Sequence, residues 1–151
     1  MSNYPIKNTY SLYLSTSSTI NPPQLHSNGL YSWSINWREI FDDLIDYNDC
    51  CICNVRTKIV TNTAVANGSV RASFSSARAK ITNGFNLGSL ESNGTISVLD
   101  QLNTKGATIE LPTNNTLQIQ LLDATEKLIT TSLQFQVWLY FDVVEHVINM
   151  D

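Results

Sequence analysis

The feature that most constrains this fold is a strict alternation of side chains near the C-terminus. Across residues 133–144, one set of alternate positions is wholly apolar: Leu133, Phe135, Val137, Leu139, Phe141 and Val143. The positions between them hold Gln134, Gln136, Trp138, Tyr140, Asp142 and Val144. Successive side chains of a strand point to opposite faces, and β-branched and aromatic residues suit a half-buried sheet. The run therefore predicts a long strand near the middle of a sheet, with one face in the core.

Shorter segments repeat this pattern along the chain. Alternation predicts strands at residues 10–15, 31–37, 51–60, 69–75, 95–99, 107–111 and 117–121. Four of the six glycines follow an asparagine, a pair typical of tight turns between strands. Residues 40–45 have helical spacing over about two turns at most. We therefore expect an all-β sandwich or barrel with about eight strands and one short helix.

The length of 151 residues predicts a single domain, residues 10–151, preceded by a polar arm at residues 1–9. The arm has too little apolar content to fold back as a strand on its own, so we expect it to contact a neighbouring subunit. Its first residues lack the charged and apolar regions of a secretory signal, and no run approaches the ~18 apolar residues of a membrane span. We expect a soluble protein made in a reducing compartment.

Charged residues make up 15% of the chain, below the usual ~25% of globular proteins. The net charge of −4 gives no case for nucleic-acid binding, which favours a basic face. Acidic residues gather between Glu39 and Asp49, whereas Arg56, Lys58, Arg71, Arg78 and Lys80 follow with no acidic residue among them. The two groups form either separate solvated patches or acidic and basic faces that meet at the rim between copies.

The residues that could hold a metal are poorly arranged for it. Cys50, Cys51 and Cys53 lie too close along one strand to pair with each other, and His26 and His146 are isolated in the sequence. The aspartates at 42–49 lack the spacing of a calcium loop. We expect buried, reduced thiols and neither metal nor cofactor. Motifs of hydrolases, nucleotide-binding proteins and zinc proteases do not occur, so we do not expect an enzyme.

Four segments together resemble a known family. They are residues 32–41 (SWSINWREIF), 85–90 (FNLGSL), 111–123 (LPTNNTLQIQLLD) and the last run at 135–144. Their order is similar to that of single jelly-roll capsid proteins, namely the penton and minor capsid proteins of large icosahedral double-stranded DNA viruses, virophages and related elements. The resemblance implies an antiparallel, eight-stranded single jelly roll without catalytic residues.

The resemblance also implies a biological setting. The chain would be made in the host cytoplasm and would lie in the virion capsid. Its partners would be other capsid proteins and further copies of itself, arranged as a cyclic homo-oligomer that is a pentamer by analogy with the family.

The surface expected to mediate self-association is the mixed face of the last strand. Trp138 and Tyr140 are large aromatic residues on the side opposite the predicted core, beside Gln134 and Gln136. Aromatic residues are enriched in the centres of protein interfaces. The other interpretation is that the N-terminal strand, with Tyr10 and Tyr13, or a long loop covers them.

The alternative function is a soluble carbohydrate-binding jelly-roll module. Tyr31, Trp33 and Trp37 share one face of a predicted strand, where their rings could stack on sugar rings. Three such residues on one face of a strand more often belong to a hydrophobic core.

Overall fold

The computed structural model describes residues 2–25, 30–43, 52–65, 67–73, 85–112, 115–127, 129 and 133–149. These residues form eleven strands and one helical turn. The elements are β1 (Ser2–Ser15), β2 (Gln24–Leu25), β3 (Leu30–Ser34), α1 (Trp37–Ile40), β4 (Ile52–Thr61), β5 (Ser69–Ser73), β6 (Phe85–Ser89), β7 (Glu91–Ser92), β8 (Ser97–Asp100), β9 (Ala107–Glu110), β10 (Thr116–Leu122) and β11 (Phe135–Asn149).

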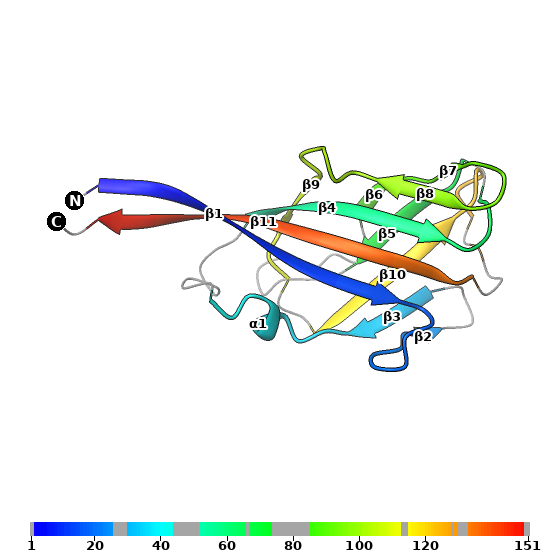
Figure 1. The fold of residues 1–151 in the computed structure, drawn as a ribbon, viewed down its shortest axis with the longest axis horizontal. Helices are drawn as coiled ribbons and strands as arrows, with labels where there is room; N and C mark the ends of the chain where they lie inside the picture. The colour runs from blue at the N-terminus through cyan, green and yellow to red at the C-terminus, as the bar shows by residue number, and fades with distance from the viewer. Residues whose placement is uncertain are drawn as a thin grey trace.

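The strands form two antiparallel sheets that face each other (Figure 1). The first, called here the terminal sheet because it contains both end strands, has the order β1-β11-β4-β8-β7, with β9 also paired to β4. The second, called the opposite sheet, has the order β2-β3-β10-β5-β6. The predicted all-β sandwich is thereby confirmed, and β11 lies inside its sheet, between β1 and β4.

The strand order is that of a jelly roll. Eight strands pair as the two arms of one long folded hairpin would: β1 with β11, β3 with β10, β4 with β8, and β5 with β6. Rolling such a hairpin into two layers gives the double Greek-key sandwich. The short strands β2, β7 and β9 are additions at the margins, which is why the strand count exceeds the predicted eight.

Aromatic rings join the two sheets through the inner face of β11. Phe135 contacts Tyr31 and Trp33 of β3, with ring centroids 4.8 and 6.0 Å apart. Phe141 contacts Trp37 and Phe41, with centroids 5.6 and 5.5 Å apart. All of these contacts are edge-to-face, the arrangement that aromatic quadrupoles favour. Every alternate residue of β11 from Phe135 to Val143 is buried, as the sequence predicted.

The end of the strand that contains Trp33 and the start of the helix differ from the sequence-based prediction. The strand predicted at residues 31–37 ends at Ser34, and Trp37 instead begins α1, which is a single turn of four residues. The Ile35 amide continues the pairing by donating to the carbonyl of Asn115, 2.8 Å away, and the chain bends away from the sheet after it. This bend lets Trp37 and Phe41 point into the core from one helical face, so helical spacing starts earlier than residue 40.

The segment expected to be an arm is the first half of a long strand. Residues 2–9 pair with residues 142–149 of β11, and these paired ends extend beyond the other strands, with both termini at the same end of the molecule (Figure 1). Backbone pairing requires a partner strand and not apolar side chains, so the polar composition of this segment did not reveal it. Contact of residues 1–9 with a neighbouring subunit remains a prediction.

Truncation of Phe141 tests the core. Phe141 is fully buried among aromatic rings, so Phe141→Ala should lower the free energy of unfolding by about 3–5 kcal/mol in a denaturant titration. Gln136→Ala, at an exposed position of the same strand, is the matched control and should change stability by less than about 0.5 kcal/mol. A loss below about 1 kcal/mol for Phe141→Ala would contradict this core.

A glycine pair tests the close approach between the β8–β9 connection and β4. Gly106 has a φ of 76°, and an added Cβ would overlap the carbonyl oxygen of Val55. Gly94 has a φ of 94° with open space around it. Gly94→Ala should therefore cost about 1–2 kcal/mol from backbone strain alone. Gly106→Ala should cost at least about 1 kcal/mol more in the same titration, and equal losses would argue against the close approach.

Candidate interaction surface

The outward face of the terminal sheet carries three rows of side chains that cross its strands. In the first row, Tyr13 of β1 lies beside Trp138 of β11, which lies beside Lys58 of β4. The second row is Ser11, Tyr140 and Arg56, and the third is Thr9, Asp142 and Asn54. Each residue belongs to the set that alternates with the buried positions of its strand.

The first row is an aromatic patch that solvent reaches. The ring centroids of Tyr13 and Trp138 are 5.2 Å apart with a 49° tilt, and Tyr13 keeps 51% of its surface exposed. Lys58 Nζ lies 5.7 Å from the centre of the Trp138 ring, within the range of a cation–π contact. Because Lys58 and the Tyr13 ring cover only part of Trp138, the Trp138 side chain remains half-buried.

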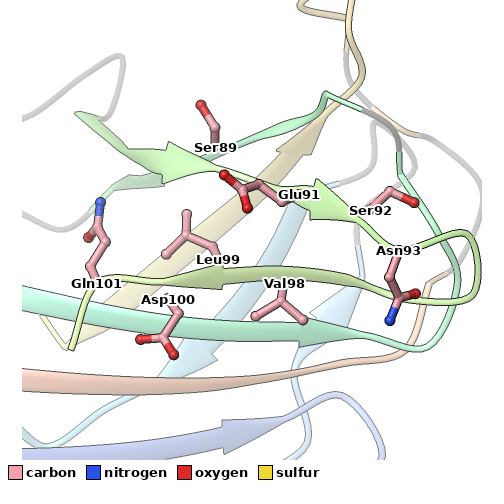
Figure 2. Close-up of a pocket in the computed structure, with 8 residues that line it drawn as sticks. All are labelled: Ser89, Glu91, Ser92, Asn93, Val98, Leu99, Asp100 and Gln101. Atoms are coloured by element: carbon pink, nitrogen blue, oxygen red, sulfur yellow. The ribbon is translucent and has the colours of Figure 1, made fainter. Parts of the chain in front are cut away.

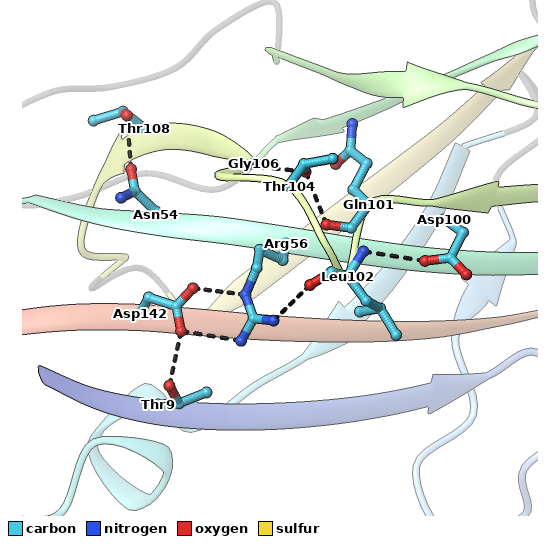
Figure 3. Close-up of polar contacts among 10 residues, drawn as sticks. All are labelled: Thr9, Asn54, Arg56, Asp100, Gln101, Leu102, Thr104, Gly106, Thr108 and Asp142. Atoms are coloured by element: carbon cyan, nitrogen blue, oxygen red, sulfur yellow. Dashed lines mark hydrogen bonds and ion pairs between the residues drawn. The ribbon is translucent and has the colours of Figure 1, made fainter.

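The second and third rows are joined by an ion pair (Figure 3). Arg56 donates two hydrogen bonds to the Asp142 carboxylate, from Nε at 2.7 Å and from Nη2 at 3.1 Å. Its Nη1 donates to the carbonyl of Leu102, 2.8 Å away, and Thr9 Oγ1 donates to Asp142 Oδ1 at 2.7 Å. This network links β1, β11 and β4 to the β8–β9 connection.

The network holds Arg56 charged and in place over Tyr140. The hydrogen bond to Asp142 is the main cause that raises the pKa of Arg56 above its ordinary value, although partial desolvation opposes it. The guanidinium carbon lies 5.4 Å from the centre of the Tyr140 ring. An open hollow of about 450 Å³ adjoins the pair, lined also by Asn54, Thr104 and Lys105. Since its guanidinium already bonds Asp142 and Leu102, we read Arg56 as part of a structural clamp.

The structure places the four predicted interface residues on this outward side. Trp138 and Tyr140 are half-buried, whereas Gln134 and Gln136 are exposed. The two glutamines lie at the start of β11, on either side of Phe135. There they line a small hollow of about 240 Å³ with Ser15, Ser17 and Asn62. The other interpretation, cover by the N-terminal strand, applies in part. Tyr13 packs beside Trp138, but Tyr10 points inward to Phe41.

The proposed sugar platform does not exist as a surface. Tyr31, Trp33 and Trp37 are 3%, 1% and 1% exposed and belong to the core. They are buried because the terminal sheet covers them, with Phe135 of β11 against Tyr31 and Trp33 and Phe141 against Trp37. Cys53 is buried, as predicted, while Cys50 and Cys51 lie outside the described residues. His26 also lies outside the described residues, as does the side chain of His146.

The basic residues predicted to form one band lie on two different faces. Arg56 and Lys58 are on the terminal sheet, but Arg71 is on β5 of the opposite sheet. The chain crosses between the layers after β4, and this crossing separates residues that are close in sequence. Arg78 and Lys80 lie outside the described residues, as do Asp46 and Asp49. On the acidic side, Glu39, Asp42 and Asp43 are exposed at α1 and the turn after it.

A third hollow, of about 360 Å³, lies along β7 and β8 (Figure 2). Glu91 and Asp100 line it from neighbouring strands, with Ser92, Asn93 and Gln101. A hard cation needs about six oxygen ligands, and two exposed carboxylates are a weak basis for such a site. Over the described part of the chain, no three histidine, cysteine or acidic residues are grouped as metal ligands would be.

The same described residues contain no helix with the length and apolarity needed to cross a bilayer.

Comparison with known proteins gives only distant similarity. No protein-family model matches the chain, and no curated protein matches it. Among solved structures, the virus-like particle of the extra small virus of the prawn Macrobrachium rosenbergii is 9% identical, with a TM-score of 0.28 over 93% of this chain and 80% of that one. A marine algae virus of the order Picornavirales is 12% identical, with a TM-score of 0.27 over 98% of this chain and 73% of that one.

The Israel acute paralysis virus pentamer is also similar, at 12% identity and a TM-score of 0.25 over 93% of this chain and 91% of that one. Overlaps of this size carry no argument about function. The jelly-roll assignment therefore stands on strand order alone.

Sequence reasoning identified the β11 side of this surface and named the N-terminal strand as possible cover, but it did not place β4 beside β11. Tyr13, Lys58 and the Arg56–Asp142 pair were each visible as polar or aromatic positions in alternating segments. Their meeting depends on the register of β1 and β4 against β11, and a register shift of one residue would move each side chain to the other face.

A double-mutant cycle tests the ion pair. Asp142 is 7% exposed, so Arg56→Met removes two hydrogen bonds from a carboxylate with little access to water and should cost about 1–3 kcal/mol. Adding Asp142→Asn should recover part of that loss, with a coupling energy of about 0.5–3 kcal/mol in denaturant titrations. The cycle of Lys58→Met with Asp100→Asn, which are opposite in register and more exposed, is the control. Additive losses at Arg56 and Asp142 would contradict the clamp.

Proposed function

We propose that this chain is a structural protein of an icosahedral viral capsid, a penton or minor capsid subunit of a DNA virus, and that it assembles with copies of itself. The jelly-roll strand order and the four sequence segments that resemble such capsid proteins support the proposal. The observation that carries it is the aromatic pair on the outward face of the terminal sheet, in which Tyr13 is exposed and Trp138 is half-buried.

This aromatic patch has the chemistry of an interface centre. Aromatic residues and arginine are enriched in the buried cores of protein interfaces, with polar residues at the rim. Tyr13, Trp138 and Tyr140 lie in adjacent rows, and the Arg56 clamp fixes the backbone beneath them. A surface already held rigid loses little conformational entropy on association, which favours binding.

The proposed assembly is a ring, a pentamer by analogy with the resembled family. A closed ring requires two different patches on each subunit that meet head to tail. The aromatic patch is one, and the exposed acidic residues Glu39, Asp42 and Asp43 are available to contribute to the other. Sugar binding is not proposed, because the aromatic residues that suggested it are buried.

Sedimentation velocity of the wild type and of Trp138→Ala tests the proposal. The wild type should run as a defined oligomer, and Trp138→Ala should weaken association by about 2 kcal/mol or more, roughly thirtyfold in the dissociation constant. Arg71→Ala, a half-buried residue on the outward side of the opposite sheet, is the matched control and should leave the oligomer unchanged.

Each outcome tests a different part of the proposal. A denaturant titration of each variant shows whether the subunit still folds. A wild type that stays monomeric at every concentration would reject self-association. An oligomer that Trp138→Ala leaves intact would keep the assembly but reject this surface.

A further inference from the structure

The free edge of β1 is a long run of backbone whose hydrogen-bonding direction can be assigned residue by residue. The Thr16 amide donates to the Phe135 carbonyl at 3.1 Å, in line with the register of β1 against β11. In an antiparallel pair, opposite residues alternate between bonded and non-bonded pairs. Even-numbered residues of β1 therefore bond to β11, and odd-numbered residues direct their amides and carbonyls to the other side.

A second bond confirms this alternation. The Asn62 amide donates to the carbonyl of Gln134, an even-numbered position next to β11, on the side of β4. Even-numbered residues of β11 therefore bond to β4, and odd-numbered residues of β11 bond to β1. The outward edge of β1 consists of the backbone groups of its odd-numbered residues, and the stretch of it between Pro5 and Ser15 contains Lys7, Thr9, Ser11 and Tyr13.

Among the described residues, no strand pairs with this edge, and β1 is the end of the strand order. Thr9, Ser11 and Tyr13 are exposed to solvent. Phe41, the residue after α1, contacts Tyr10 of β1 from the core side through its ring. A 14-residue edge whose only charged residue is Lys7 has little of the charge by which proteins usually protect such edges from pairing.

The two ends of the open stretch are blocked in complementary ways. Pro5 has no amide hydrogen to donate, and proline is tolerated in strands where this side faces outward. The carbonyl of Ser15 already accepts the amide of Ser18, 3.3 Å away. In an antiparallel pair of two β1 strands centred on Tyr10, Pro5 of one copy lies opposite Ser15 of the other. The amide hydrogen that Pro5 lacks would have bonded the Ser15 carbonyl of the other copy. That carbonyl already accepts the Ser18 amide, so no acceptor is left without a donor.

From this self-complementarity we propose that β1 pairs antiparallel with β1 of a second copy of this chain, across a two-fold axis at Tyr10. Thr9 of one copy lies opposite Ser11 of the other, and Lys7 lies opposite Tyr13. The terminal sheets then form one continuous sheet across both copies. β7, at the other end of the same sheet, has only two residues and is too short to serve as this partner.

This contact differs from the aromatic surface and does not depend on it. Strand addition extends the sheet in its own plane, so the outward face with Trp138 remains accessible. The contact is isologous, whereas a ring uses a head-to-tail contact. A subunit with both kinds of contact can join one ring to the next, as a closed shell requires.

Proline substitution at the edge is the first test. Ser11→Pro removes an outward amide and leaves the bonds between β1 and β11 intact, while Ser11→Ala keeps that amide. To isolate the edge, both are made in the Trp138→Ala background, which should form dimers through β1 alone. By sedimentation, Ser11→Ala should remain dimeric, and Ser11→Pro should weaken the dimer by about tenfold or more, because each copy loses a hydrogen bond.

Disulfide trapping tests the register even if the proline variant does not fold. Opposite bonded residues have Cα atoms about 5.5 Å apart, within the range of a disulfide. A mixture of Thr9→Cys and Ser11→Cys proteins should therefore cross-link much faster than Thr9→Cys alone. Thr9→Cys mixed with Ser92→Cys, on exposed β7, is the control for random oxidation and for the native cysteines. Equal cross-linking in all three, or a Trp138→Ala protein that is strictly monomeric, would overturn the proposal.

Discussion

The structure depends on the position of β11 between two antiparallel partners, with its alternate residues in the core. Its inner face presents Phe135 and Phe141 to the rings of β3 and α1, and these contacts hold the two sheets together. Its backbone pairs with β1 over residues 136–149 and with β4 over residues 135–143. Burial of apolar surface is the dominant favourable term in folding, and here one strand brings together the rings of both layers.

The outward side of the same strand has a different physical character. A buried core tolerates polar groups only when they are paired, whereas this face combines half-exposed rings with a charged pair that also bonds to Thr9 and Leu102. The Arg56–Asp142 pair spans neighbouring strands and includes the β8–β9 connection, so it fixes the local register as well as the charge. The face is therefore both rigid and partly apolar, which is the combination that favours association.

Much of the fold followed from the local pattern of the sequence. The strands at β4, β8, β9 and β10 were predicted close to their observed bounds, because alternation reports directly which side of a strand meets the core. The last strand was predicted near its observed start but runs five residues beyond the predicted end. Trp138 and Tyr140 were correctly placed on the outward side of β11 for the same reason. The first strand was predicted too short, since residues 2–9 are polar and their pairing comes from a segment more than 130 residues away.

What the sequence by itself determined was the faces: the buried set of β11, the all-β class and the aromatic residues opposite the core. What only the tertiary structure decided was which strands are neighbours. Register brought Tyr13 and Lys58 to Trp138 and Arg56 to Asp142, and layer crossing separated Arg71 from Arg56. The physical reason is that side-chain alternation is a property of one strand, whereas pairing joins segments far apart in the chain through backbone groups that every residue shares.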